Sequence, residues 1–531
     1  MWRSSADADT DADAGRPLSV RHRGTDPTDR GEITVHTVRS RELTDAIVFV
    51  AGDWRVTRGE YEDRVARAVT VLRQRGIGAG GCIGIALRNR PQFFELLTAA
   101  TAVGAQAVPI AWRLKRDEVR YLAEDSGVEL LVFDPEAAEA TAGLPGLALD
   151  AYERLLATAE PAADVDAAPA GFRLELYSSG TTGRPKAIER ELTAEIQPDD
   201  KPPDTRKLGF LGMLGVADPD EVHLFCGPLY HSQPIGFATS ALSAGHRVVM
   251  MEGSFDAQNC LRLIERERVT WMTCVPTHLV RILAVPDVER YDLSSIKAVF
   301  HSAAPCPRDV KARIMELFPP DTVWEVYGGT EGSLTMISPH EWLQKPGSVG
   351  RAFPPGTELH ILDDDGNELP AGSLGLVYGR SPIMTRFHYR GAPELDAETW
   401  RGDLFTLGDV GLVDEDGYLF LADRKKDMII SGGANVYPAE VEAVLFNHPA
   451  VGDAAVIGVP DPEWGESVKA IVEPRAPVTA GEIIEHCRAN LAHYKCPKTV
   501  EFMTRLPRDP SGKVRKRELR EPYWSGAGRA V

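Results

Sequence analysis

The residues best suited to bind phosphate lie between Leu176 and Ala187, where the chain reads LYSSGTTGRPKA. Hydroxyls and backbone amides at this density can surround phosphate oxygens, and glycines let the backbone approach a ligand closely. Lys186 adds a mobile positive charge to the run. The Walker pattern is excluded, because no Ser or Thr follows the lysine and the glycine spacing differs. We interpret the run as a phosphate-binding loop, with a flexible polar loop as the alternative.

A second chemical cluster is VYGGTEGS, at residues 326–333. Tyr327 offers an aromatic face beside two glycines, which suits stacking on a nucleotide base. Thr330 can donate to a phosphate, and the carboxylate of Glu331 can hold Mg²⁺. An ordinary hairpin turn is the alternative for this segment.

A third candidate is Asp409, which lies between Gly408 and Gly411. Its carboxylate could accept hydrogen bonds from both hydroxyls of a ribose. Arg424, 15 residues further on, could add a phosphate or ribose contact. Each residue also has a simpler interpretation, as a turn aspartate and as an exposed salt-bridge partner.

Two more candidates come from other parts of the chain. His231, in PLYHSQP, lies just beyond an expected strand end, where open α/β sheets bind ligands. Lys513, on the glycine turn SGK, could be carried into a site by movement of a second domain. A structural histidine and a solvated lysine are the alternatives. We expect the neighbouring basic residues 515–517 to form a solvated face.

Composition narrows the classes of function. The 531 residues are 43% hydrophobic and 26% charged, as in a soluble globular protein, and suggest three to four domain-sized units. The net charge of −19 argues against a nucleic-acid or anionic-membrane partner. No run approaches the ~20 apolar residues of a membrane span. The acidic N-terminus has no signal-peptide core, and the seven scattered cysteines form no CxxC pair, so we expect reduced thiols in the cytoplasm.

Apolar runs alternate with helical patterns along most of the chain, which predicts parallel sheets covered on both faces. Strands are expected at residues 82–87, 105–110, 128–133, 222–226, 247–251, 269–275 and 298–301. Helices are expected at residues 61–72, 91–103, 116–124, from about 236, and at 258–267. After about residue 345, recurring Gly and Asp turns between short runs indicate a small β-rich subdomain.

The predicted fold class is therefore α/β: a large N-terminal domain with βα-layered sheets and a small β-rich subdomain, followed by a small, mobile α+β C-terminal domain. We expect a disordered acidic tail at residues 1–30 and a large domain at 31–425, with subdomains at about 31–170, 171–345 and 346–425. The C-terminal domain would span 426–531, with helices at 440–446 and 483–491 and strands at 454–459 and 468–472. We expect its last basic stretch, PRDPSGKVRKRELR, to be a loop.

Taken together and in this order, four segments resemble the adenylate-forming superfamily of acyl-CoA synthetases, peptide-synthetase adenylation domains and luciferases. They read SSGTTGRPK, YGGTEG, GDVGLVDEDGYLFLADRKKDMIISGGANVYPAEVE and LPRDPSGKVRK. The resemblance covers about residues 40–520 and implies a two-step reaction. ATP and a carboxylic acid give an acyl-adenylate and pyrophosphate, and a thiol, usually that of CoA, then displaces AMP. It implies Mg²⁺ as the cofactor, ATP as the nucleotide and CoA as a co-substrate.

The resemblance also implies a role for each matching residue. Thr181, Thr182 and Lys186 would cradle the β- and γ-phosphates, Thr330 would contact the α-phosphate, and Thr181 and Glu331 would hold Mg²⁺. Lys513 would bridge the carboxylate and the α-phosphate, and His231 would border the acyl carboxylate; with Thr330 and Glu331 these form the catalytic set. The full ATP/AMP-binding set implied is Ser178, Ser179, Gly180, Thr181, Thr182, Gly183, Lys186, Ser302, Ala303, Ala304, Pro305, Tyr327, Gly328, Asp409 and Arg424.

Family members rotate the small domain between the two steps, around a hinge two residues after the arginine. That position is Lys426 here. The rotation would withdraw Lys513 and bring in the SGGANVYP loop, where Gly432 and Gly433 would line the CoA tunnel.

The sequence departs from the family pattern in three places. Ala187 replaces the usual glycine after PK and is followed by IERE at residues 188–191. An insertion is expected at about 195–210, and RFHYRGAPE at 386–394 stands where relatives often read GYWxxPE. These departures bear on the acyl pocket and on the acceptor, because the same regions lie near that pocket in the family.

The acid is predicted from the pocket candidates Tyr230, Gln233, Ile235, Gly236, Phe237 and Gly329, with Ser232, His301 and Gly328 beside them. No large side chain precedes Thr330, which would leave the pocket floor open and favours a bulky or cyclic hydrophobic acid. HSQPIGF contains no acidic residue to bind an α-amino group, which disfavours an amino acid.

We therefore expect an ATP-dependent, AMP-forming acid–thiol ligase of secondary or fatty-acid metabolism. Its partners would be a small carboxylic acid and CoA, with no nucleic acid and no membrane span. The oligomeric state stays open, with a homodimer as one option. Two alternatives remain: transfer of the adenylate to an amine or a carrier protein, and a non-catalytic sensor of acyl nucleotides.

Overall fold

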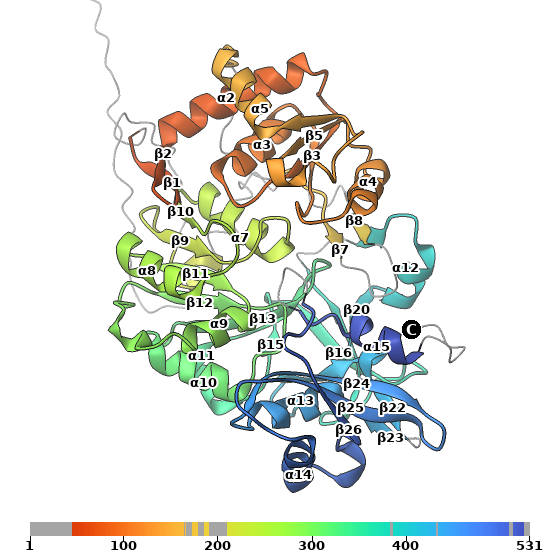
Figure 1. Cartoon of the computed structure of the whole chain (residues 1–531). Coiled ribbons are helices and arrows are strands. Elements are labelled where there is room, and N and C mark those ends of the chain that lie inside the picture. The colour runs from red at the N-terminus through yellow and green to blue at the C-terminus, as the bar shows by residue number, and fades with distance from the viewer. Residues whose placement is uncertain are drawn as a thin grey trace, which may run out of the picture.

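The structure, a computed structural model, describes residues 45–163, 165, 172–178, 185–190, 210–382, 386–431, 434–508 and 513–524 (Figure 1). Several expectations fall outside these ranges: the disordered tail, nearly all of the insertion, and the site residues Ser179, Gly180, Thr181, Thr182, Gly183, Gly432 and Gly433.

The largest sheet in the described part of the chain has nine strands in the order β15-β14-β13-β12-β11-β9-β10-β1-β2. Its middle strands, from β13 to β1, pair in parallel, and the outer pairs are antiparallel. The strands are β1 (Ile47–Ala51), β2 (Trp54–Thr57), β9 (Val222–Phe225), β10 (Arg247–Met250), β11 (Trp271–Cys274), β12 (Ala298–His301), β13 (Val323–Gly328), β14 (Ser333–Ile337) and β15 (Arg351–Ala352).

Both faces of this sheet are buried, because successive residues of each strand point to opposite sides. In β10, Val248 and Met250 join one hydrophobic core and Val249 joins the other. The first core also holds apolar residues of α2 (Arg58–Gln74), α3 (Pro91–Ala102) and α7 (Ser232–Ser243). The second is closed by α8 (Ala257–Glu267), α9 (Pro276–Leu283) and α10 (Arg308–Leu317).

A smaller parallel sheet, β4-β3-β5-β6, shares the first core. It comprises β3 (Cys82–Ala86), β4 (Gln106–Pro109), β5 (Leu130–Phe133) and β6 (Gly146–Ala148), beside α4 (Arg116–Asp125) and α5 (Leu149–Thr158). The expected strands and helices of this region are present, and no end is shifted by more than two residues.

The β-rich region contains two antiparallel sheets. One has the order β16-β17-β20-β19, with β21 paired to β20, and its strands are β16 (Glu358–Leu362), β17 (Gly375–Arg380), β19 (Trp400–Arg401), β20 (Leu404–Val413) and β21 (Leu419–Arg424). The other joins distant segments in the order β18-β8-β7, with β7 (Tyr177–Ser178), β8 (Lys186–Arg190) and β18 (Phe387–Tyr389). Helices α11 (Pro339–Gln344) and α12 (Pro393–Thr399) flank these strands in sequence.

The C-terminal unit has one sheet with a helix-covered core on each face. The sheet orders β23-β22-β25-β24, with β26 on β25. Val456 faces the core formed with α13 (Pro438–Phe446) and α14 (Ala480–Asn490), and Ile457 faces the core that contains Leu519. The strands are β22 (Ile429–Ser431), β23 (Ala434–Val436), β24 (Val451–Asp461), β25 (Gly465–Pro474) and β26 (Thr499–Phe502).

The expectation of a C-terminal loop is wrong for its second half, since Lys516–Trp524 forms helix α15. Lys516 is also not part of a solvated face: its Nζ lies 2.8 Å from Glu442, and only 16% of its side chain is exposed. Burial works to lower the pKa of Lys516, but the charges of Glu442 and Asp423 outweigh it and the pKa is raised. The helix forms because it can bury Leu519 and place this cation between two carboxylates.

The α/β fold class is confirmed by this architecture. Every cysteine lies within the described residues and is unpaired, as the lack of a CxxC pattern predicts. Among the described residues, no helix is both long and apolar enough to cross a bilayer.

The Lys516 cluster leads to the first prediction. Lys516→Met would leave Glu442 and Asp423 without their shared cation, and we expect the local stability of α13 and α15 to fall by about 3 kcal/mol. Hydrogen exchange of peptides spanning the two helices would measure this as a loss of protection of about 100-fold. The control is Arg517→Met, at an exposed position of the same helix. Equal protection in the two variants would contradict the assigned role of the cluster.

Candidate functional site

The predicted site residues gather at the carboxyl ends of the parallel strands. His231 follows β9, residues 302–305 follow β12, and residues 329–331 follow Gly328, the last residue of β13. Gln233 reaches the same edge, because its Nε2 donates to the carbonyl of Cys274 at the end of β11, 3.0 Å away. Open α/β sheets bind ligands at this edge.

Tyr327, Asp409 and Arg424 form a partly buried network that joins β13 to the β20–β21 pair. The Tyr327 hydroxyl donates to Asp409 Oδ2 at 2.7 Å, and Arg424 Nε lies 3.2 Å from Asp409 Oδ1. Asp409 and Arg424 are paired residues of β20 and β21, so the ladder itself sets their distance. Burial and the charge of Asp409 raise the pKa of Tyr327 well above its usual value. The hydroxyl therefore remains a donor, and Asp409 has oxygens held in a fixed direction.

The start of α7 meets the turn after β13. Ser232, the first residue of α7, lies within hydrogen-bond distance of Thr330, with 3.2 Å between the two hydroxyl oxygens. His231 is the N-cap of the same helix, and its ring lies 4.7 Å from that of Tyr230. His231, Tyr230 and Thr330 are thus brought to one place by two elements about 100 residues apart.

Gly328 and Gly329 have a structural reason to be glycines. Gly329 and Gly332 exchange backbone hydrogen bonds of 2.8 and 3.2 Å, which closes a tight turn. A Cβ at Gly328 would lie 2.5 Å from the carbonyl oxygen of Gly332, and one at Gly329 would lie 2.4 Å from Glu331 Oε2. At Gly328 the turn itself excludes a side chain, because the close contacts are with backbone, whereas at Gly329 a side chain would have to displace the Glu331 carboxylate. The two glycines therefore give no separate indication of an open pocket floor. Open space is instead found at Gly236, where an added Cβ would meet no atom within 4 Å.

The other acyl-pocket candidates differ in their exposure. Ile235 is 1% exposed and belongs to the first hydrophobic core, and His301 is fully buried, which lowers its pKa well below the usual value. Phe237 is half-buried and packs edge-on against Phe300, with ring centroids 4.8 Å apart. In this conformation Phe237 and Gly236 are nearer to the surface than Ile235 and His301.

The loop of the expected base pocket, Ser302 to Pro305, contains an unusual backbone. Ala303 has a φ of +76°, a left-handed conformation that is strained for a residue with a Cβ. Ser302 is buried, and Ala303 and Ala304 are half-buried, directly beyond the end of β12. Strained residues of this kind cluster at ligand sites.

The described ends of the phosphate-loop candidate are Ser178 and Lys186. They are paired residues of β7 and β8, and the hydroxyl of Ser178 lies 3.5 Å from the Lys186 carbonyl oxygen. The antiparallel pair therefore brings the two ends of the run together.

Glu331 has two neighbours that the sequence analysis did not select. The hydroxyl of Tyr389 donates to Glu331 Oε1 at 2.9 Å. The guanidinium of Arg190 donates to the carbonyl oxygens of Thr330 and Glu331 at 3.0 and 2.9 Å. Both residues lie in segments that depart from the family pattern, and that departure was the available signal.

The residues present fit a magnesium ion carried by the phosphates of a nucleotide. No group of three or more His, Cys, Asp or Glu side chains among the described residues could enclose a metal ion. Glu331 alone supplies a carboxylate beside Thr330, and Mg²⁺ is commonly held by one or two carboxylates together with substrate phosphates.

The charge of Lys513 acts on Lys426, the expected hinge residue. The pKa of Lys426 is lowered to about 8, chiefly by desolvation. The positive charges of Arg424, Arg520 and Lys513 lower it as well, and the negative charge of Asp427 opposes the shift. The Arg520 guanidinium also donates to the Lys426 carbonyl, 3.2 Å away. This contact ties α15, just after Lys513, to the expected hinge.

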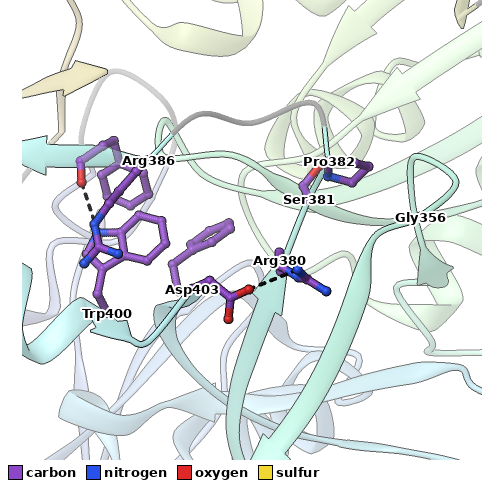
Figure 2. A pocket seen from close by; sticks show the side chains of 9 residues that line it. Gly356, Arg380, Ser381, Pro382, Arg386, Trp400 and Asp403 are labelled. Atoms are coloured by element: carbon purple, nitrogen blue, oxygen red, sulfur yellow. Dashed lines mark hydrogen bonds and ion pairs between the residues drawn. The ribbon is translucent and has the colours of Figure 1, made fainter. Parts of the chain in front are cut away.

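A cavity of about 490 Å³ lies beside β18, lined in part by Arg386 and Phe387 (Figure 2). Trp400 donates to the Phe387 carbonyl there, and Arg380 pairs with Asp403 at 3.0 Å. Its lining contains no predicted site residue: it consists of Gly356, Arg380, Ser381, Pro382, Arg386, Phe387, Trp400, Asp403 and Phe405.

Comparison with known proteins identifies the family. Residues 36–389 match the AMP-binding enzyme profile, and residues 440–513 match that of the AMP-binding enzyme C-terminal domain. A feruloyl-CoA synthase of Amycolatopsis is 36% identical over 91% of this chain and 97% of its own. A long-chain-fatty-acid–CoA ligase of Mycobacterium tuberculosis is 32% identical over 90% of this chain and 95% of its own. Among solved structures, the o-succinylbenzoate CoA synthetase of Bacillus subtilis in complex with its acyl-adenylate intermediate superposes with a TM-score of 0.76. It is 28% identical, and the match covers 90% of this chain and 96% of that chain.

The Tyr327 network gives the second prediction. Tyr327→Phe removes one of the two groups that hold the Asp409 carboxylate and should weaken ATP binding about tenfold, since hydrogen bonds to charged groups are among the stronger ones. Titration calorimetry with ATP would measure the change. The control is Tyr418→Phe, which removes a hydroxyl that donates to Glu341 at 3.3 Å outside the site. Unchanged ATP affinity in Tyr327→Phe would show that Asp409 does not need this donor.

Proposed function

The chain belongs to the AMP-binding enzyme family, and on that premise we propose that it is an ATP-dependent ligase that joins a bulky or cyclic hydrophobic carboxylic acid to CoA. The observation that carries the proposal is the convergence of Tyr327, Asp409 and Arg424 beside the Thr330–Glu331 turn. Tyr327 supplies an aromatic face, Asp409 an acceptor for the ribose hydroxyls and Arg424 a cation. Thr330, in the adjacent turn, supplies a hydroxyl that can donate a hydrogen bond to a phosphate.

The first step would convert a poor electrophile into a reactive one. A carboxylate oxygen attacks the α-phosphorus of ATP, the bond to the β-phosphate bridging oxygen breaks, and pyrophosphate leaves with the electron pair. Asp409 and Tyr327 orient the nucleoside, and Thr330 and Lys513 donate to the oxygens on which negative charge accumulates. Mg²⁺, when bound with ATP at Glu331, would supply further charge neutralisation.

The second step would transfer the acyl group to the thiol. The thiolate sulfur attacks the acyl carbon, the carbon–oxygen bond to AMP breaks, and AMP leaves as a stable anion. His231, at the N-cap of α7, borders the path to the acyl carbon in this proposal. Rotation about Lys426 would exchange Lys513 for the loop after β22, so that one opening serves both steps.

The proposed acid class rests on two observations. Gly236, an exposed residue of α7, has open space where an added Cβ would meet no atom within 4 Å, and the half-buried aromatic Phe237 follows it in the chain. Feruloyl-CoA synthase and o-succinylbenzoate CoA synthetase, by their names, act on acids that contain an aromatic ring. The fatty-acid ligase among the relatives makes long-chain acids the principal competing class.

The third prediction concerns the substrates. With Mg·ATP and CoA, we expect pyrophosphate release with aromatic acids such as ferulic and indoleacetic acid and little release with acids of two to four carbons. Mass spectrometry of the products should find the acyl-CoA. Activity with the short acids alone would refute the acid class. An acyl-AMP product without stimulation by CoA would instead mean that the acceptor is an amine or a carrier protein.

The fourth prediction concerns Lys513. Lys513→Ala should lower pyrophosphate release at least 100-fold, because one donor to the developing charge is lost. Transfer from a preformed acyl-adenylate to CoA should change less than about tenfold, since the lysine would be withdrawn in that step. The control is Lys498→Ala, which removes a half-exposed lysine paired with Asp461 in the same unit. Undiminished pyrophosphate release in Lys513→Ala would exclude the lysine from adenylation.

A further inference from the structure

The two segments that depart most from the family pattern lie side by side. Strand β8 carries Ala187 and residues 188–190, and it pairs with β18 from the 386–394 segment, although about 200 residues separate them. Phe387 is opposite Arg190, and Tyr389 is opposite Ile188. One small sheet therefore contains both departures. A side chain from each of them, Arg190 of β8 and Tyr389 of β18, reaches the Thr330–Glu331 turn.

Arg190 is suited to hold a backbone in place. Its Nη2 donates to the carbonyl oxygens of both Thr330 and Glu331, 3.0 and 2.9 Å away, and its guanidinium lies 6.0 Å from the Phe387 ring centroid. A planar guanidinium keeps a fixed relation between its hydrogen bonds, which a lysine ammonium does not. The two successive carbonyls are thus fixed relative to β8.

Tyr389 holds the side chain of the same turn. Its hydroxyl donates to Glu331 Oε1 at 2.9 Å, while Oε2 of that carboxylate lies over Gly329. The direction of the carboxylate is therefore set by Tyr389.

Strand β18 is itself firmly anchored, which makes it a suitable support. Arg390, the next residue, pairs with Glu175 and Glu189 and donates to the Asp125 carbonyl at 3.0 Å. The backbone N–H of Tyr389 donates to Asp396 at 2.8 Å. On the side of the cavity, Trp400 donates to the Phe387 carbonyl at 3.0 Å (Figure 2).

We propose that Arg190 and Tyr389 are positioning residues, which hold the Thr330–Glu331 turn so that the Glu331 carboxylate can face a magnesium ion on the phosphates of bound ATP. The inference rests on the proposed function, because it requires a nucleotide at this turn. Neither residue is assigned contact with the nucleotide. Their effect is to fix the carbonyls and the carboxylate before the nucleotide binds, so that no binding energy is spent on ordering them.

The test compares nucleotide binding with and without the metal ion. The probe is α,β-methylene-ATP, which cannot be cleaved at the reacting bond, titrated by calorimetry in Mg²⁺ and in EDTA. The variants are Arg190→Met, Arg190→Lys and Tyr389→Phe. In Mg²⁺ we expect affinity to fall about tenfold for Arg190→Met and Tyr389→Phe, with a smaller loss for Arg190→Lys. In EDTA we expect each variant to match the wild type within about twofold.

A second readout is the Mg²⁺ concentration that gives half-maximal pyrophosphate release, which should rise in the same order. The matched controls are Arg386→Met and Tyr418→Phe. Arg386 also donates to a backbone carbonyl, that of Gly402, and lies 4.6 Å from the ring centroid of Trp400, but it lines the cavity and, within the described part of the chain, makes no hydrogen bond to the Thr330–Glu331 turn. Tyr418 also donates to a glutamate, at Glu341. Both controls should behave as the wild type.

Several outcomes would overturn the inference. Equal losses of affinity in Mg²⁺ and in EDTA would mean that the residues shape the nucleotide pocket in general. Unchanged affinity in Tyr389→Phe and Arg190→Lys, the two most conservative variants, would remove both positioning roles. If the wild type itself neither bound the analogue nor released pyrophosphate, the proposed function would fail first, and this result is distinct from the failure of a variant.

Discussion

The hydrogen bond between Tyr327 and Asp409 is the contact on which the arrangement of the site depends. It joins β13 of the nine-stranded sheet to β20 of the antiparallel sheet, two elements 82 residues apart. Asp409 is only 8% exposed, so its charge requires the tyrosine hydroxyl and the Arg424 guanidinium as partners. Gly328–Glu331 begins directly after Tyr327, and the expected hinge, Lys426, is two residues after Arg424. The position of this carboxylate therefore influences both the turn beside the nucleotide and the start of the C-terminal unit.

Burial of both sheet faces explains why the site lies at a sheet edge. Each strand from β13 to β1 is parallel to its neighbour and packs against helices on both sides, which leaves no polar face. Backbone that is not hydrogen-bonded in a ladder can then occur only in the loops at the strand ends. The left-handed Ala303 and the tight turn at Gly329 are found in such loops.

The β18-β8-β7 sheet gives the two ends of the phosphate-loop candidate a rigid base. Ser178 and Lys186 are held together by the pairing of β7 with β8, and β8 is held in turn by β18. Arg390 adds three carboxylate and carbonyl contacts from α4, β8 and the residues before β7. This small sheet therefore connects the two ends of the phosphate-loop candidate to the Glu331 turn.

The local pattern of the sequence was sufficient to determine the alternation of strands and helices, the fold class and the short segments that carry the chemistry. These depend on neighbours within a few residues, and apolar periodicity and glycine spacing report them directly. Helix α15 escaped prediction because its stability comes from Leu519 and from the Lys516 pair with Glu442, 74 residues earlier. The contacts of Arg190 and Tyr389 with Glu331 span 141 and 58 residues. Only the tertiary structure decides such contacts, since they follow from the packing of sheets against one another and leave no periodic trace in the chain.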